Sequence, residues 1–477
     1  MIRKAAIYSL VIVSTTLAET TTSPAWAPAP IPCVKGQGYI GLWRAGSDPI
    51  NNYCGAIATA DNSNLPMAYY AEKVNKTFFV FGGIPKDGPE TKNRPAALAM
   101  ISYYDHNTGT VPRPTALPIN KTGQLYENPT LTLDNQGYIW IFLGNNGKHN
   151  PGCILKSNKP FDIDSFTLVK QDNFSNPQPW FLDNKGLLLI YNRAEDKRRQ
   201  LFYTTSQDGH NFSKPQLLAD IGKRQDALSW QHKNKIAVAF NVYADDKSPT
   251  NLYYMETSDF GKSWRNSRRQ KIEMPLKTID NPGLVYDYLS HKWLIHLKDL
   301  NIDQFGYPTI VYIMGRTHPS NPKLNRNIWN TARWFGRDWE ITGQIRSDNQ
   351  LDSGCLHINK DRSWRLIAPT EAGPQPSAPG GEIAMWTSED QGRSWFKHPM
   401  TKNSKFNHNY VRRPVNAHAE FDTFWCDGHP QKPSLSRIYF ADQTGKVSVL
   451  PTRMIKDFEK PRPVAPASQK TTSTKPN

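Results

Sequence analysis

The densest group of side chains able to do chemistry lies near the C-terminus, within residues 407–418. It combines two imidazoles, a phenol, two guanidiniums and an amide, in the order His408, Tyr410, Arg412, Arg413, Asn416 and His418. A guanidinium can hold a carboxylate or sulfate through two parallel hydrogen bonds, and His and Tyr can transfer protons. These residue types predict acid–base chemistry on an anionic substrate. The catalytic candidates are His408, Tyr410, Arg413 and His418, and the binding candidates are Arg412 and Asn416. The alternative for any one of them is a structural contact that fastens a loop to backbone carbonyls.

Further polar candidates stand at the ends of predicted strands. Tyr126 and Asn128 precede one strand, Gln178 precedes the next, and Arg193 follows that strand. Side chains at equivalent strand ends of a repeating sheet face one region, so Tyr126 is a catalytic candidate and the other three are binding candidates. The competing interpretation is that an N-P or Q-P step only marks the start of a strand, since the residue before Pro favours extended geometry.

Arg333 and Glu382 form a third set of substrate-binding candidates. Glu382 begins the strand that leads into residues 388–395, and a Glu there can act as an acid or a base. Pairing with an Arg is an equally good explanation for its charge. The sequence has no C-x-x-C pair and no D-x-D-x-D-G loop, so we expect no metal site and no cofactor.

These candidates must be positioned by a repeat that runs through the chain. Short turns rich in Asn, Asp, Gly and Lys are each followed by an apolar stretch that predicts a strand. They centre near Asn75, Asn135, Asn184, Asn234, Ser290 and Lys360, with one more inside 427–436. A second series alternates with them, near Asn107, Asn158, Asp208, Asp259, residues 318–336, Asp390 and Thr444. Each unit has room for four short strands, which is the content of one propeller blade.

Three turns of the second series share the template [ST]-x-D-x-G-x-[ST]-W. It occurs in residues 257–264 and 388–395, and one residue shorter in 206–212. The Asp can accept backbone N–H groups inside a tight turn, and the Gly takes a conformation that a Cβ would forbid. The aromatic residue packs beneath the turn. The template resembles the Asp-box, or BNR repeat, of sialidases and other carbohydrate-active propellers.

We therefore predict an all-β fold, a seven-bladed β-propeller with Asp-box turns. Six blades is the main alternative, because the first and last units are the least regular. A β-sandwich with a second domain does not explain the sustained alternation of turns. Closure into a ring buries both faces of each four-stranded unit and leaves only short edges exposed.

The two ends of the chain differ from this repeat. Arg3 and Lys4, an apolar run and Ala25-Trp-Ala27 predict a signal peptide over residues 1–27, and hence a secreted or periplasmic protein. One domain is expected over residues 28–454, with 28–60 as a lead-in segment that completes the last blade or covers one end. Residues 455–477 are expected to be a disordered basic tail. No later apolar run is long enough to span a bilayer, so we expect no membrane insertion.

The chain is basic, with a formal net charge of +16 at pH 7. This charge predicts an acidic partner such as a uronate-bearing or sulfated polysaccharide, although a merely solvated basic surface is the alternative. No nucleic-acid-binding motif is present, so we expect no nucleic-acid partner, and we expect a monomer. Of the five cysteines, Cys33 and Cys54 are the most plausible local bridge, and the odd number leaves at least one thiol unpaired.

Several longer stretches resemble the BNR-4 repeat family, a group of exported propellers that includes ulvan lyases and rhamnose–glucuronate lyases. The resemblance covers roughly residues 38 to 454, and the stretches that carry it are residues 102–109, 128–142, 251–264, 368–376 and 412–418. In this family the resemblance implies neutralisation of a uronate carboxylate, removal of the C5 proton and expulsion of the C4 oxygen.

Carried over residue by residue, the resemblance gives each candidate a role. It implies that Arg412, Arg413 and either Asn128 or Gln178 hold the carboxylate. His408 or His418 would be the base, and Tyr410 or Tyr126 the acid. This chain departs from the family pattern where a His is expected, because Tyr126 stands there instead. A Tyr in that place either replaces the His as the base or marks a changed or lost activity.

Three functions remain open at this point. The first is a lyase that eliminates at a uronate of an acidic polysaccharide. The second is a glycoside hydrolase, either sialidase-like or acting through a carboxylate pair such as Glu127 and Glu382. The third is a propeller that binds glycans without catalysis.

Overall fold

The computed structural model describes residues 29–43, 55–57, 63–84, 90–91, 94–95, 98–118, 129–144, 151–195, 198–245, 247–316, 327–376 and 378–465. Within these residues the chain is all-β, and the 3₁₀ helix η1 (Glu72–Val74) is the sole helical segment. The strands form successive, mainly antiparallel sheets, in which neighbours in sequence are mostly neighbours in space. Short hairpin connections produce this kind of topology.

The N-terminal half contributes three sheets. The first has the order β2 (Val34–Lys35), β10 (Thr115–Leu117), β8 (Leu98–Asp105), β5 (Lys76–Gly83) and β4 (Ala68–Ala71). The second has the order β1 (Ala29–Pro30), β14 (Phe166–Asp172), β13 (Gly152–Ser157), β12 (Ile139–Leu143) and β11 (Thr130–Leu133). The third consists of β15 (Ser175–Leu182), β16 (Gly186–Glu195), β17 (Arg198–Ser206), β18 (Gln216–Ala219), β19 (Arg224–His232), β20 (Lys235–Tyr243), β21 (Pro249–Thr257), β22 (Trp264–Arg265), β23 (Lys271–Ile272) and β24 (Leu284–Tyr286). Its two halves are joined by one parallel bridge between Arg199 and Arg224.

The C-terminal half contributes three further sheets. The first has the order β25 (Leu294–Ile302), β26 (Pro308–Gly315), β27 (Asn327–Trp334) and β28 (Trp339–Ser347). The second has the order β29 (Cys355–Ile358), β30 (Trp364–Glu371), β31 (Glu382–Ser388) and β32 (Phe396–Pro399). The third consists of β33 (Asn407–Arg412), β34 (Thr423–Gly428), β35 (Ser434–Ala441), β36 (Val447–Val449), β38 (Arg462–Pro463) and β3 (Ile40–Trp43). Two small pairs remain, β9 (Val111–Pro112) with β37 (Phe458–Glu459), and β6 (Glu90–Thr91) with β7 (Arg94–Pro95).

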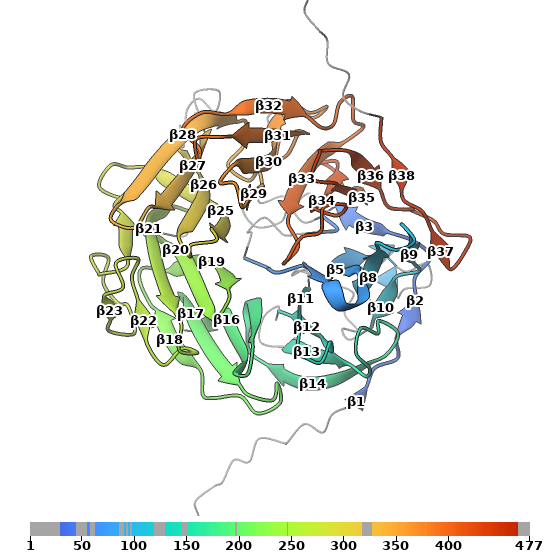
Figure 1. Cartoon of the computed structure of the whole chain (residues 1–477), viewed down its shortest axis with the longest axis horizontal. Helices are drawn as coiled ribbons and strands as arrows, with labels where there is room; N and C mark the ends of the chain where they lie inside the picture. Colours follow the sequence, from blue (N-terminus) through green and yellow to red (C-terminus); the bar gives the residue numbers. More distant parts are fainter. Residues whose placement is uncertain are drawn as a thin grey trace, which may run out of the picture.

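The sheets are arranged around a common centre, as Figure 1 shows. Strands that begin a unit, among them β11, β19, β25 and β29, lie nearest to this centre, and later strands such as β14, β28 and β32 lie farther out. The arrangement is propeller-like. It brings strand ends that are far apart in sequence to one axial region, which is the geometry that a shared site requires.

The Asp-box turns have the predicted construction. In the turn after β21, Asp259 accepts the backbone N–H of Ser263 at 2.9 Å and the hydroxyls of Thr257 and Ser263. Gly261 has a φ of +85°, and a Cβ there would lie 2.4 Å from the ring of Tyr203. Trp264 is buried beneath the turn and meets Tyr203 edge-on, with ring centroids 5.5 Å apart. The template therefore marks a tight turn, and in this turn the Gly and the Trp both contact Tyr203 of the preceding unit.

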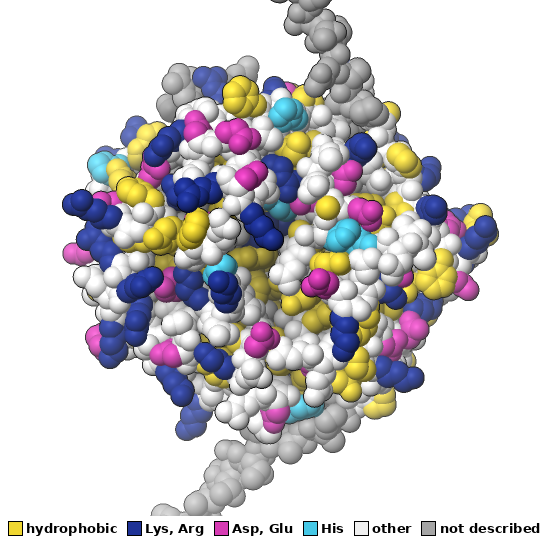
Figure 2. Space-filling view, in the orientation of Figure 1, with side chains coloured by type: hydrophobic (Ala, Val, Ile, Leu, Met, Phe, Trp, Pro, Cys, Tyr) yellow, Lys and Arg dark blue, Asp and Glu magenta, His cyan; other side chains and the backbone are white. Residues whose placement is uncertain are grey.

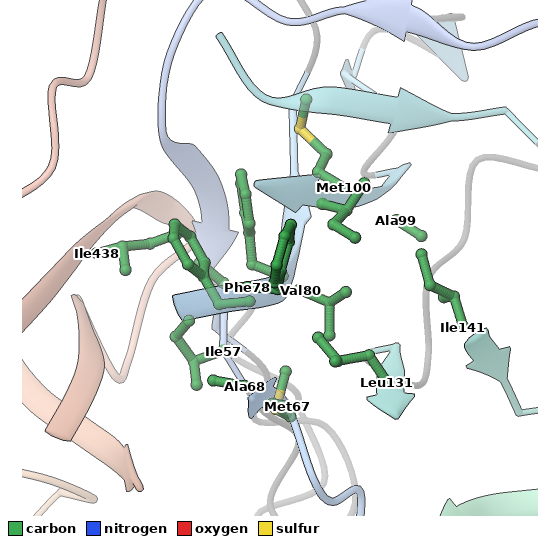
Figure 3. Close-up of a cluster of buried hydrophobic side chains, with 14 of the residues drawn as sticks. Ile57, Met67, Ala68, Phe78, Val80, Ala99, Met100, Leu131, Ile141 and Ile438 are labelled. Atoms are coloured by element: carbon green, nitrogen blue, oxygen red, sulfur yellow. The ribbon is translucent and has the colours of Figure 1, made fainter. Parts of the chain in front are cut away.

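Apolar side chains of adjacent sheets fill the space between them. Figure 3 shows Phe78 and Val80 of β5 packed with Met67, Ala68 and Leu131 from neighbouring strands. All five side chains are buried. Both faces of these strands are covered, so their sequences read as continuous apolar runs rather than as an alternation.

The two ends of the described chain pair with sheet edges. β3 pairs with β35 of the last sheet. The prediction of a disordered tail from residue 455 is wrong for its first part, because β37 pairs with β9 and β38 with β36. The Glu459 carboxylate also accepts the backbone N–H groups of Ile455 and Lys456, which holds this segment in a turn. Residues 466–477 and the predicted signal peptide lie outside the described residues.

The fifth unit differs from the prediction. A turn does lie near Ser290, where the Lys292 N–H donates to the Leu289 carbonyl at 3.0 Å just before β25, but the hairpin turn between β25 and β26 lies at 303–306. Asp303 accepts the backbone N–H groups of Phe305 and Tyr307, and Gly306 takes a φ of +87°. This Asp and Gly form the turn, so Lys298 and Asp299 lie inside β25 rather than after it.

The cysteines and the surface complete the description. Cys33, Cys153, Cys355 and Cys426 are free thiols, and Cys54, the predicted partner of Cys33, lies outside the described residues. Figure 2 shows Lys and Arg side chains spread over the visible face with acidic side chains among them, and not gathered in one patch. Among the described residues, no helix has the length and apolar character needed to cross a membrane.

Candidate active site

A cross-strand pair at the open end of one hairpin combines a guanidinium with a phenol. Arg224 begins β19 and Tyr243 ends β20, and they face each other at the end opposite the turn. The Arg224 Cζ atom lies 4.0 Å from the centroid of the Tyr243 ring, and Arg224 Nη2 donates to the Tyr243 hydroxyl at 3.0 Å. The antiparallel register of the hairpin therefore assembles this pair.

Asp226 joins the two side chains into a triad. Its Oδ2 atom accepts the Tyr243 hydroxyl proton at 2.7 Å and the Arg224 Nη2 hydrogen at 3.0 Å. Burial alone would raise the pKa of Asp226, but the nearby Arg224 and Arg199 guanidiniums outweigh burial and lower it. Asp226 is therefore ionised near neutral pH, and it fixes the direction of the Tyr243 hydroxyl.

More cations surround this triad. Arg199 pairs with Arg224 through the parallel bridge and with Ala194 across the β16–β17 hairpin. Arg193, one of the predicted binding residues, is the neighbour of Ala194 on the same strand end. Lys247 lines the depression beside the triad. Several positive charges around one carboxylate create a region that attracts polyanions.

His296 supplies an unprotonated imidazole to the same depression. It lies on β25, beside Lys298 and close to Asp226 and Arg224. Burial, followed by the charge of Lys298, lowers the pKa of His296 to about 3. Its ring is hydrogen-bonded to the Gln350 side chain, and its Nε2 atom has no hydrogen-bond partner among the described residues. A neutral imidazole with one uncommitted nitrogen can accept or relay a proton.

A buried Lys–Asp pair lies behind His296. Burial lowers the pKa of Lys298 to about 7, and burial raises the pKa of Asp352 to about 6. Lys298 Nζ donates to the Gln350 carbonyl oxygen at 2.7 Å, and Asp352 accepts the Gly380 N–H at 2.7 Å and the Ser347 hydroxyl. These contacts hold β25 against the segment before β29, so they support the wall of the site.

The predicted cluster at residues 407–418 is mostly structural. His408 is buried, accepts the Trp425 Nε1 hydrogen at 2.9 Å and contacts the Ser404 hydroxyl at 2.8 Å through its other nitrogen. Both ring nitrogens are engaged, so the environment does not suit a base. Tyr410 is buried against Trp43 with its ring centroid 5.1 Å away, which does not suit an acid either. Arg412 is buried within β33.

Arg413 is also committed to the interior. Its Nε atom donates to Asp299 at 3.0 Å, its Nη2 atom donates to the Leu300 carbonyl at 2.7 Å, and its Cζ lies 3.4 Å from the Trp230 ring centroid. The guanidinium thus fastens the segment after β33 to β25 and β19. This corrects its assignment as the residue that holds a substrate carboxylate.

Two other predicted binding residues have structural partners. Gln178 is buried, donates to the Ala227 carbonyl at 2.8 Å and accepts the Ser229 N–H at 2.6 Å, which joins β15 to β19. Glu382 is buried and accepts the Ser404 N–H at 2.7 Å and the Ser404 hydroxyl at 2.8 Å. Each side chain satisfies buried polar groups, so neither is placed to bind a substrate.

The remaining candidates are scattered. Arg333 lines a separate depression between β26, β27 and the turn after β29. Asn416 makes a side-chain hydrogen bond with Tyr69, and His418 lies beside His106 at the turn end of the first sheet. Tyr126 and Asn128 lie outside the described residues.

The three residues of the triad do not form a cluster in the sequence. Arg224, Asp226 and Tyr243 are separated by up to 19 residues, but a hairpin turn near Asn234 was predicted. Counting outward from that turn along two strands places residue 224 opposite residue 243, as the register shows. The signal was therefore present for this pair, whereas His296 comes from another sheet and had no such signal.

Comparison with known proteins agrees with the motifs. The model of a family described as "BNR repeat-containing family member" matches residues 112–345, which confirms the resemblance to the BNR-4 family. An ulvan lyase of Nonlabens ulvanivorans is 22% identical over 351 residues, which cover 62% of this chain and 71% of that protein. An ulvan lyase of Alteromonas sp. (strain LOR) is 20% identical over 404 residues, which cover 73% and 80%.

Solved structures give the same picture of the fold. A PL25 ulvan lyase superposes with a TM-score of 0.67 at 16% identity and covers 85% of this chain and 96% of its own. A structure of a PL25 ulvan lyase bound to -[GlcA(1-4)Rha3S]- has a TM-score of 0.66 at 17% identity, with the same coverage. At these identities the likeness shows the fold.

Proposed function

We propose that this protein is a polysaccharide lyase that eliminates at a uronate of an acidic polysaccharide. The observation that carries the proposal is the Arg224–Asp226–Tyr243 triad, ringed by cations and faced by the neutral His296. The relatives support the class of reaction, since two of them are named ulvan lyases, and one similar structure is described as bound to a glucuronate-containing fragment.

The chemistry requires a neutralised carboxylate, a base and an acid. Arg224 and Arg199 flank the place where a uronate carboxylate would sit, and neutralising it makes the C5 proton more acidic. We assign His296 as the base that takes this proton. Its Nε2 atom is shielded from solvent in the free protein, so the ring must turn toward the substrate on binding, where the bound carboxylate raises the affinity of the imidazole for the proton. The C5–H electrons form the C4–C5 double bond, and the C4–O bond breaks.

Tyr243 protonates the departing oxygen. Its hydroxyl is held between Asp226 and Arg224, so its direction is fixed before substrate binds. The proton leaves the phenol as the leaving group forms, and Arg224 stabilises the phenolate by charge and by stacking on the ring. The proton taken by His296 and the proton given by Tyr243 balance over one turnover, and exchange with water restores both groups.

The proposal includes the wider setting of the site. The successive units form a seven-bladed β-propeller whose axial region holds the active site, and residues 28–454 make up its single domain. Residues 1–27 direct export, so the protein acts as a secreted or periplasmic monomer. The net charge of +16 supports an acidic polysaccharide as the partner.

Incubation of the mature protein with uronate polysaccharides tests the reaction class. Elimination creates an unsaturated uronate that absorbs in the near-ultraviolet, so absorbance and reducing ends should rise together. Reducing ends without absorbance would identify a hydrolase and overturn the proposal. A mobility shift in a polysaccharide affinity gel, with neither product, would identify a binding protein.

A further inference from the structure

Two histidines and a glutamate from opposite ends of the chain meet at one place in the fold. His106 lies in the turn after β8, and His418 and Glu420 lie in the connection between β33 and β34. One ligand atom from each of these side chains lies within 4.8 Å of the others. The cluster lies beside the turn that joins β4 to β5. Arg224 and Tyr243 lie at the end of the β19–β20 hairpin that is opposite its turn, so the two sites are at different ends of their sheets.

The side chains are held in place by their surroundings. His106 Nδ1 lies 3.2 Å from Glu420 Oε2, and His106 Nε2 lies 2.8 Å from the Thr77 hydroxyl. The His106 side chain is 1% exposed and that of Glu420 is 56% exposed. The rings of His106 and His418 are 3.8 Å apart between centroids, and Tyr70 packs against both. One side of the cluster is therefore buried and the other is open to solvent.

Two imidazoles in contact with each other and with a carboxylate are electrostatically unfavourable unless a cation lies between them. Protonation of both rings would place two positive charges side by side, and two neutral rings leave one carboxylate without a full counter-charge. Two imidazole nitrogens and one carboxylate oxygen are ligands that Zn²⁺ accepts, with water in the fourth position. A His that donates its second N–H to a fixed hydroxyl, as His106 can to Thr77, is the usual support for such a ligand.

We propose that His106, His418 and Glu420 bind a divalent transition-metal ion, with Zn²⁺ as the best match to these ligands. The His106–Glu420 separation of 3.2 Å already suits two ligands of one tetrahedral ion. His418 Nδ1 accepts the Glu420 backbone N–H at 3.2 Å, and one ligand atom of His418 lies within 4.8 Å of those of His106 and Glu420. This assigns His418 a ligand role in place of its predicted role as a base.

The ion would join the first sheet to the last sheet. His106 and Glu420 are 314 residues apart, and they belong to segments that border the first and the last sheets of the described chain. Backbone contacts at this seam include the bridge between Tyr69 and Val415. A metal bound only by the folded chain stabilises that chain, by an amount that grows with metal concentration.

Direct titration tests the proposal. Tag-free full-length protein is stripped with a chelator, and Zn²⁺ is added while binding heat and the thermal unfolding midpoint are followed. We expect one ion per chain and a midpoint that rises with Zn²⁺. Co²⁺ as a second probe should give visible absorption bands of a four-coordinate site. No binding to the stripped, folded protein would overturn the proposal.

Variants locate the ion. The double variant His418→Ala and Glu420→Gln should weaken Zn²⁺ binding at least tenfold and abolish the rise in midpoint. His398→Ala removes an exposed histidine on β32 and is the matched control, so it should bind as the parent does. Equal loss in the control, or unchanged binding in the double variant, would show that the ion sits elsewhere. If the double variant fails to fold, Glu420→Gln alone, at an exposed position, answers the question by its affinity.

Discussion

Arg413→Ala separates a structural role from a catalytic one. The Arg413 side chain is 7% exposed and that of its partner Asp299 is 9% exposed, so the substitution leaves a buried carboxylate without its counter-charge. Loss of one member of a buried ion pair costs about 3–5 kcal/mol. Asp299 keeps two backbone donors, the N–H groups of Leu300 and Leu356, which moves the expected cost to the lower part of that range.

The stacking of the guanidinium adds to this cost. Arg413 Cζ lies 3.4 Å from the Trp230 ring centroid, and a desolvated cation–π contact is worth about 1–2 kcal/mol. We therefore expect Arg413→Ala to lower the free energy of unfolding by about 4 kcal/mol. Arg413→Lys keeps the charge but loses the planar contact and the bond to the Leu300 carbonyl, so it should cost about half as much.

Denaturant unfolding monitored by tryptophan fluorescence measures these differences. Arg268→Ala is the matched control, because Arg268 pairs with Asp338 at 3.1 Å but both side chains are more than half exposed. Exposed pairs contribute little, so the control should unfold with the parent. The reasoning would be refuted if Arg413→Ala unfolded like the parent while losing elimination activity, since Arg413 would then serve the substrate.

Three further predictions concern the active site and the fold. Tyr243→Phe should lower kcat by about 10²–10⁴-fold in the near-ultraviolet assay with little change in the free energy of unfolding. Tyr286→Phe, the control at an exposed tyrosine, should keep the kcat of the parent. Equal activity of the two variants would remove Tyr243 from the mechanism. His296 binds a proton below pH 6.5 in the unfolded chain but only near pH 3 in the folded one, so the free energy of unfolding falls as the pH falls from 6.5 to 3. In acid unfolding curves, His296→Gln should make this fall in the free energy of unfolding shallower. Asp259→Ala should cost about 2–3 kcal/mol in denaturant unfolding because it removes three hydrogen bonds to a carboxylate in an Asp-box turn; an unchanged midpoint would contradict the assigned role of the turn.

Much of the fold could be predicted from the sequence because its signals are local. The turns near Asn184 and Asn234, and the Asp-box at 257–264, depend on a few adjacent residues that satisfy one another. In the fifth unit the turn formed by Asp303 and Gly306 was not predicted, because the polar residues near Ser290 form a turn of their own just before β25. The start of the tail was misread because its composition is polar, although strand pairing orders it.

The site was harder to predict because its chemistry depends on burial. Arg413 and Gln178 have the right types for binding a carboxylate, but Asp299 and Ala227, which engage them, are far away in sequence. A sequence does not show which polar side chain is already used by another. His296 lies on a strand of another sheet, so no local signal showed that it comes close to Asp226 and Arg224.

The central claim is that this site breaks a sugar linkage by elimination. The most direct test is digestion of a uronate polysaccharide in water enriched in heavy oxygen, with the product masses read by mass spectrometry. Elimination adds no water, so we expect products with an unsaturated end and no heavy oxygen at the cleaved bond. Products that carry one heavy oxygen and the mass of a full water molecule would contradict the account.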